Sequence, residues 1–125
     1  MVLAQLTRQE ILDRLQTVAT TLSATLTNLF PAAVPTGKIR YVVGIILIGD
    51  GAVSRTVSIA KVSPAGVGTT VFPNLPVQPT AIVQLPQANY EIEDPIITCE
   101  DQTYLAAQAS GGTPFATVIY WDSER

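Results

Sequence analysis

The sequence predicts a mainly β protein: an antiparallel, jelly-roll-like β-sandwich of seven or eight short strands, preceded by one amphipathic α-helix. After Thr36, short apolar runs bounded by Gly, Pro, Asp and Ser recur about every ten residues, as expected of strands. No helical pattern separates these runs, so antiparallel pairing and two packed sheets are expected. Before Pro31, apolar residues instead recur at helical spacing.

The expected helix begins at a capping box and ends before a proline. Thr7 and Glu10 have the spacing at which their side chains satisfy the free amides of a first helical turn. Pro31 cannot extend a helix, so the segment is expected to close at about Phe30. Between these limits a stripe with the alternating four- and three-residue spacing of a heptad repeat is formed by Ile11, Leu15, Val18, Leu22, Thr25 and Leu29.

The apolar stripe allows two interpretations. The helix either folds back onto its own β domain, or bundles with its copies or docks on a neighbouring subunit. The regular heptad spacing, the Thr-rich opposite face and the proline-containing stretch after the helix favour the second. We therefore expect an oligomerisation or docking helix over residues 1–30, a linker over 31–36 and a sandwich over 37–125. The expected oligomer or capsid interface consists of Ile11, Leu15, Val18, Leu22 and Leu29.

The β region divides at turn residues. In chain order, the expected strands are residues 40–48, 55–62, 69–72, 80–85, 90–92, 96–99, 103–109 and 115–122. Gly and Asp in the stretch 49–52 tolerate the positive φ of tight turns. In the strand 55–62, Val57 and Ile59 alternate with Thr56 and Ser58, which predicts one buried and one solvent-facing side.

The composition favours a protein that assembles with partners. Charged residues make up 14% of the chain, against about 25% in typical soluble domains. A chain with so little charge often buries part of its surface against other subunits. The net charge is −3 and the seven Lys and Arg residues are scattered, whereas nucleic-acid binding needs them clustered. We therefore expect no nucleic-acid partner.

The residue types exclude most catalytic and metal sites. The chain has no His and one Cys, which removes the Ser-His dyad and zinc sites. Glu91, Glu93 and Asp94 lie close to Glu100 and Asp101, but without the spacing of a calcium loop. Cys99 cannot form an intrachain disulfide and is expected to be a small buried residue. The chain is thus expected to be no enzyme and to hold no metal or cofactor.

No membrane or targeting segment is expected either. Residues 1–6 lack the basic start and apolar core of a signal peptide. The longest apolar run, residues 41–48, is far shorter than the ~20 residues of a membrane-spanning helix.

The β region resembles small tailed-bacteriophage virion proteins of the capsid decoration (cement) type. The similarity lies in the Gly-Lys pair that leads into the apolar run 37–47, in residues 54–59, in the Pro- and Leu-containing link 72–77, and in residues 96–109. Such proteins usually have Gly-Asp before the late strand, where this chain has Glu100 and Asp101.

The resemblance implies a structural protein that stabilises a virus head by binding between capsid subunits. It further implies a homotrimer, the major capsid protein or another virion subunit as partner, and a place in the virion after assembly in the host cytoplasm. It gives no catalytic residue to carry over.

One alternative stays open: Tyr120 and Trp121 beside Phe115 either close the core or form a carbohydrate-binding platform, as in a receptor-binding module of a tail or head fibre. Core is the favoured interpretation.

Overall fold

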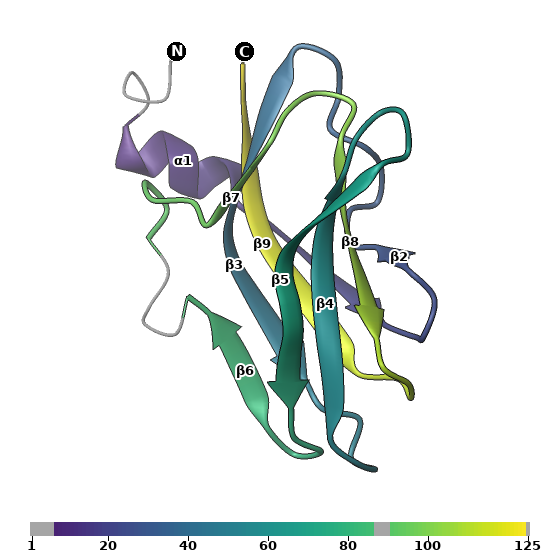
Figure 1. Cartoon of the computed structure of the whole chain (residues 1–125). Helices are drawn as coiled ribbons and strands as arrows, with labels where there is room; N and C mark the ends of the chain where they lie inside the picture. Colours follow the sequence, from purple (N-terminus) through teal and green to yellow (C-terminus); the bar gives the residue numbers. More distant parts are fainter. Residues whose placement is uncertain (1–6, 87–90, 125) are drawn as a thin grey trace.

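Two antiparallel sheets pack face to face and confirm the predicted sandwich (Figure 1). The computed structural model describes residues 7–86 and 91–124. Sheet A has the strand order β1-β9-β3-β6, with β7 also paired to β3, and sheet B has the order β2-β8-β4-β5. The helix α1 spans Arg8–Arg14, and the strands are β1 Gln16–Thr21, β2 Thr27–Asn28, β3 Lys38–Ile48, β4 Arg55–Val62, β5 Gly68–Val77, β6 Ile82–Leu85, β7 Ile97–Cys99, β8 Tyr104–Ala109 and β9 Phe115–Glu124.

The centre of sheet A is β3, the strand with the longest unbroken apolar run. It pairs with β9 from Lys38 to Ile48 on one side. On its other side, β7 pairs with Arg40 to Val42 and β6 with Ile45 to Ile48, so the two short strands follow one another along the same edge. Val42, Ile45 and Leu47 point into the main core and are fully buried. Because side chains alternate along a strand, the intervening residues face the outer side of sheet A.

Most strand predictions are confirmed, with one instructive difference in length. The expected strand 55–62 coincides with β4. The strand expected to end before Pro73 continues to Val77 as β5, through Pro73 and Pro76. β5 lies at the edge of sheet B, where a missing N–H on the outer side breaks no ladder bond. Of the expected strand 90–92, Tyr90 lies outside the described residues, and Glu91 and Ile92 belong to no strand.

The prediction of a helix up to about Phe30 is wrong beyond Arg14. The capping box is present, since the Thr7 hydroxyl accepts from the Glu10 amide and the Glu10 carboxylate accepts from the Thr7 amide. The helix nevertheless ends after seven residues, and its C-cap, Leu15, is already extended (φ −61°, ψ 133°). β1 then pairs residue by residue with β9, from Gln16 opposite Tyr120 to Thr21 opposite Phe115.

The physical reason lies in the residue types of β1. Four of its six residues, namely Thr17, Val18, Thr20 and Thr21, are β-branched. Such side chains lose rotamer freedom in a helix and pack well on a pleated sheet. The long strand β9 offers a complete hydrogen-bond ladder, so tertiary pairing overrides the heptad spacing. The two N-terminal strands also raise the count from the expected seven or eight to nine strands within the described residues.

The predicted linker over 31–36 belongs to the sandwich, so the chain is not divided there. Val34 is fully buried in the main core. Its amide donates to the Thr103 carbonyl (2.8 Å), and its own carbonyl accepts from the Gln102 amide (2.7 Å). Phe30, just before this stretch, is also buried. The stretch around Phe30 and Val34 is therefore an integral part of the main core of the sandwich.

A second, smaller core lies on the outer side of sheet A. Ile11 from α1 and Ile92 pack there against Tyr41, Val43 and Trp121, all at most 4% exposed. The segment around Ile92 and α1 thus covers the end of sheet A that carries the C-terminus (Figure 1). The opposite end of the same outer face receives no such cover from the residues of this core.

Asp50 connects the turn that follows β3 with the turn that precedes β9. Its carboxylate accepts from the amides of Ala52 (3.0 Å) and Thr113 (3.2 Å) and from Arg55 Nε (3.1 Å). The Ala52 amide is the largest cause of a lowered Asp50 pKa, and Thr113 and Arg55 lower it further against the opposing effect of burial. A Cβ on Gly112 would come within 2.0 Å of this carboxylate, so the contact requires glycine there.

The hydrogen bonds of the Asp50 carboxylate predict that folding stability depends on pH. A carboxyl whose folded-state pKa is lowered stabilises the fold at pH values above its unfolded pKa of about 3.9, and the stabilisation disappears as pH falls through the folded-state pKa. We expect Asp50→Asn to lower the melting temperature at pH 7. Between pH 4 and pH 2, the melting temperature of the variant should fall less than that of the wild type, as measured by circular dichroism. Parallel wild-type and variant curves across that acid range would contradict the assignment.

Candidate interaction surface

The half of the outer face of sheet A that lies beyond the smaller core around Ile11 (the α1 core) carries a row of exposed apolar side chains. Ile48 on β3 lies opposite Ile82 on β6 and opposite Phe115 on β9. Their exposed fractions are 38%, 69% and 45%, respectively. Three large apolar residues on three adjacent strands, in one line across the sheet, form a surface that gains from being covered. We call Ile48, Ile82 and Phe115 the apolar row.

The side chains around the apolar row are neutral. The next line across the sheet, toward the covered half, consists of Gln84, Ile46, Thr117 and Ala19, which the strand registers place side by side. Thr21 continues the row itself onto β1, opposite Phe115. None of these residues carries a charge, so an approaching neutral surface would not have to desolvate an ion.

Sequence reasoning missed the apolar row, although a signal for it exists. In the run from Tyr41 to Ile48 apolar residues occupy both alternating sets of positions, which is typical of a strand covered on both faces. In β3 the second face is covered only as far as the α1 core reaches. Ile46 and Ile48 lie beyond it, and Ile48 remains exposed. The apolar run thus indicated that both faces of β3 are suited to burial, and one part of the outer face is left exposed.

The predicted interface residues lie elsewhere, inside their own chain. Leu22 and Leu29 are fully buried in the main core, and the partly buried Val18 packs against it. Ile11 is buried in the α1 core, where Leu15 packs against it. The structure therefore brings these five residues into two intrachain cores instead of one exposed helical seam. The predicted helical seam is therefore wrong, and the coiled-coil basis for a trimer is lost with it.

The aromatic residues confirm the core interpretation over the platform. Trp121 is 0% and Tyr120 is 1% exposed. Trp121 packs against Tyr41 with ring centroids 4.7 Å apart and ring planes tilted by 35°, and its indole N–H donates to the Ile92 carbonyl. A carbohydrate platform needs exposed ring faces, which these two residues do not provide. Only Phe115 of the proposed trio is exposed, as part of the apolar row.

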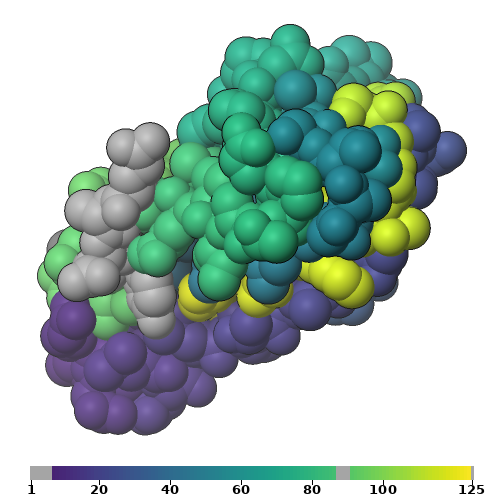
Figure 2. Space-filling model, turned by 90° about the horizontal axis from the view of Figure 1, so that it is seen from below, coloured from purple at the N-terminus to yellow at the C-terminus, as the bar shows by residue number. Residues whose placement is uncertain are grey.

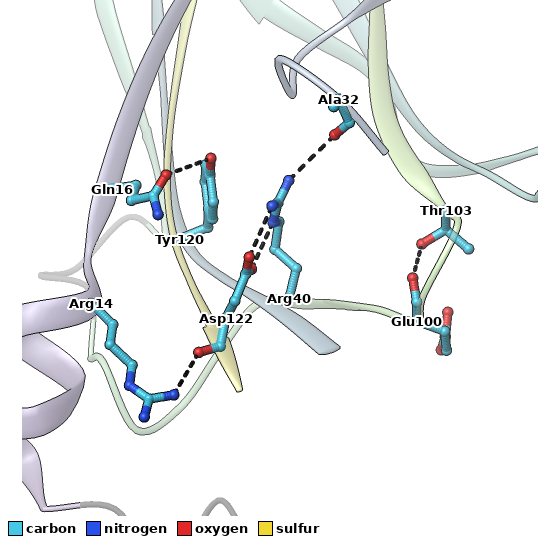
Figure 3. Close-up of polar contacts among 8 residues, drawn as sticks. All are labelled: Arg14, Gln16, Ala32, Arg40, Glu100, Thr103, Tyr120 and Asp122. Carbon is cyan, nitrogen blue, oxygen red and sulfur yellow. Dashed lines mark hydrogen bonds and ion pairs between the residues drawn. The ribbon is translucent and has the colours of Figure 1, made fainter. Parts of the chain in front are cut away.

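A buried ion pair fixes the covered end of the two central strands (Figure 3). Arg40 on β3 donates through Nε and Nη2 to both carboxylate oxygens of Asp122 on β9, at 2.7 and 2.9 Å. The guanidinium lies 4.6 Å from the centroid of Phe30 and 4.2 Å from that of Tyr120. Burial alone would lower the pKa of Arg40, but the hydrogen bond and charge of Asp122 outweigh it and raise the pKa.

This network also ties the helix to the sheet. Arg14 Nη1 at the end of α1 donates to the Asp122 carbonyl (3.1 Å), as Figure 3 shows. A polar hollow of about 420 Å³ lies beside it, between the end of α1 and the ends of β3 and β9. Its lining mixes basic and acidic side chains, among them Lys38 and Glu124, which form an ion pair with each other. The positive and negative charges in this cluster neutralise one another in part, and the contacts of Arg14 hold α1 against sheet A.

The remaining groups that could react or bind a metal are the Cys99 thiol and the acidic residues. Cys99 is fully buried, and burial is the largest cause of the rise in its pKa to about 11, which keeps the thiol protonated. Among the acidic residues considered for calcium, Glu93 pairs with Arg8 (3.6 Å) and Glu100 with Lys61 (3.4 Å). Within the described ranges, no three potential ligands gather into a metal site. Within the same ranges, no helix has the length and apolar character needed to cross a membrane.

Comparison with known proteins shows likeness at the level of the sandwich. No family model matches the sequence. No curated protein matches it significantly. Among solved structures, the chain is similar to one from the Bacillus endospore appendages that form disulfide-linked pili, with 14% identity, a TM-score of 0.44, and coverage of 86% of this chain and 83% of that one.

Two further similar structures come from infectious bursal disease virus. A chain of its T13 viral particle has 13% identity, a TM-score of 0.44 and coverage of 86% of this chain, and one of the Gt strain has 10%, 0.33 and 89%. This chain spans about a third of their lengths, 35% and 33%. None of the three is described as a phage decoration protein. Taken together, the chain is a mainly β protein of two antiparallel sheets and one short N-terminal helix.

Proposed function

We propose that this chain is a structural subunit of a virion, a decoration protein that binds between capsid subunits and stabilises the head. The proposal combines the sequence resemblance with one structural observation, the apolar row of Ile48, Ile82 and Phe115 on an uncharged sheet face. The role is structural and not enzymatic. Its partners are neutral, apolar surfaces of neighbouring virion subunits.

The geometry of the apolar row suits repeated, weak contacts. A sheet face is preformed and rigid, so it covers a partner without losing much conformational freedom on binding. Burying a fully exposed large apolar side chain contributes about 1.5–3 kcal/mol, and each residue of the apolar row contributes a fraction of this because it is already partly buried. Contacts of this size become effective when many copies bind a lattice whose subunits also touch one another. The small number of charges on the chain fits such a setting, since the lattice and not the lone subunit then determines solubility.

The test is binding to particles from the source that encodes the chain, prepared without it. We expect purified wild-type protein to sediment with these particles at a fixed number of copies per capsid subunit. The triple variant Ile48→Thr, Ile82→Thr, Phe115→Thr should bind at least tenfold more weakly, since losing even 1.4 kcal/mol changes affinity tenfold. Threonine keeps the β propensity of the three strands, so the fold should persist.

Val67→Thr is the matched control. Val67 is 65% exposed but lies in the β4–β5 turn, away from the apolar row. We expect it to bind like the wild type. Wild-type protein that fails to sediment with the particles, or a triple variant that binds as well as Val67→Thr, would overturn the proposal.

A further inference from the structure

The four sheet edges of this sandwich are protected to different degrees. β2, β6 and β7 have two, four and three residues. β5 has ten residues but contains Pro73 and Pro76, and its register with β4 shifts twice. Short strands, prolines and bulges are the usual means by which proteins keep edges from pairing with other chains. Each of these edges therefore carries at least one such device.

β1 carries none of them. Its six residues, Gln16–Thr21, contain no proline, glycine or charge, and their register with β9 is unbroken. β9 is the one strand of the described residues that pairs with β1, so the other edge of β1 has no strand beside it there. In Figure 2 the violet N-terminal part lies along one side of the molecule, next to the yellow C-terminal strand. An edge of this kind is a template for strand addition.

We propose that β1 pairs with β1 of a second copy, antiparallel and about a two-fold axis, which joins the two A sheets into one. This inference goes beyond the proposed virion role and does not depend on the apolar row. A second copy fits this edge because identical strands match in length and a two-fold interface is self-complementary.

The pleat restricts the register of the pair. Thr17, Ala19 and Thr21 face the outer side of sheet A with Ile119, Thr117 and Phe115, while Val18 faces inward with Val118. In a continuous sheet, opposed residues share a face. A pair centred on Ala19 satisfies this condition, placing Ala19 opposite Ala19 of the second copy, Thr17 opposite Thr21, and Val18 opposite Thr20. Thr–Thr and β-branched pairs of this kind stabilise cross-strand contacts.

Charge places no obstacle in the way. β1 is neutral throughout, so antiparallel pairing opposes no like charges, which would otherwise repel one another. In this register Gln16 opposes Leu22, which follows β1, and Leu15, which precedes β1, opposes Ser23, so the flanking pairs are also uncharged. Val18, half-buried at the open edge of the main core, would become fully covered.

Cross-linking tests the register. Across the two-fold axis, Cα atoms of directly opposed residues lie about 4.5–5.5 Å apart, within disulfide range. We expect Ala19→Cys to form a disulfide-linked dimer under mild oxidation, while the one native thiol, Cys99, stays buried and unreacted. Thr17→Cys is the matched control. It lies on the same face and is exposed, but its copy would be about four residues away along the strand, too far to link.

A charge swap tests the pairing without cysteines. Light scattering across a dilution series should give the wild type a mass of twice the 13.3 kDa chain. Thr17→Lys with Thr21→Lys opposes two lysines in each pair and should weaken the dimer at least tenfold. Thr17→Lys with Thr21→Glu opposes unlike charges and should keep it. Both variants should melt cooperatively, which separates lost pairing from lost folding.

Several outcomes would overturn the inference. They are a wild type that stays monomeric throughout the series, a trimer indifferent to these substitutions, equal masses for the two charge variants, or a Thr17→Cys link as efficient as that of Ala19→Cys. A failure of this kind leaves particle binding through the apolar row untouched, because the triple variant tests that surface separately.

Discussion

Asp122→Ala is expected to destabilise the fold by about 3–5 kcal/mol, because it leaves the charge of Arg40 buried without a counter-ion. The Arg40 side chain is 7% exposed and that of Asp122 21%, and their two hydrogen bonds form a bidentate pair. Phe30 and Tyr120 hold the guanidinium in place, so it cannot turn out to water. Urea unfolding followed by tryptophan fluorescence measures the loss.

A double variant shows whether the loss comes from the orphaned charge. Arg40→Met with Asp122→Ala removes both ions and should be markedly more stable than Asp122→Ala alone. Glu124→Ala breaks the neighbouring pair with Lys38, in which the carboxylate side chain is 66% exposed. Exposed pairs of this kind contribute about 0–1 kcal/mol. An Asp122→Ala variant no less stable than Glu124→Ala would contradict the buried-ion account.

Leu22→Ala is expected to cost about 2–5 kcal/mol of folding free energy and to leave the mass of the protein unchanged. Leu22 is fully buried in the main core just after β1, so its truncation removes apolar burial and leaves a cavity. The same unfolding assay measures the cost, and light scattering measures the mass.

Leu12→Ala is the control on the same N-terminal segment. Leu12 is 41% exposed on α1, so its truncation should have little effect on stability. If residues 8–30 formed a helical oligomerisation seam, Leu22→Ala would lower the mass and leave the monomer as stable as before. That pattern would contradict the placement of Leu22 in the core of its own sandwich.

Local patterns in the sequence predict a strand best where the alternation of apolar and polar residues agrees with one buried and one solvent-facing side of that strand. Val57 and Ile59 alternate with polar residues, and β4 has one face on the core and one in water, so its bounds agree with the expectation. The capping box of Thr7 and Glu10 forms for the same reason, since it depends on four adjacent residues alone. Trp121 and Tyr120 follow the rule that aromatic rings usually close a core.

The segment from Leu15 to Val34 could not be predicted from local pattern, because its structure is decided by distant partners. Leu22 and Leu29 fit a heptad, but the ladder of β9 and the carbonyl of Leu105, which accepts from the Leu29 amide, stabilise an extended chain. The interaction surface depends in the same way on tertiary structure. The apolar row exists because β6, β3 and β9 lie side by side, and no spacing in the sequence gives that order.

The central structural claim is that the N-terminal segment is a strand of sheet A, since the β1 edge depends on it and the predicted helix is replaced by it. Nuclear Overhauser contacts in isotope-labelled protein test it most directly. The account predicts cross-strand contacts of Val18 with Val118 and of Ala19 with Thr117, residues about a hundred positions apart. Contacts between residues three and four apart through Gln16–Thr21, without those to β9, would show a helix and contradict it.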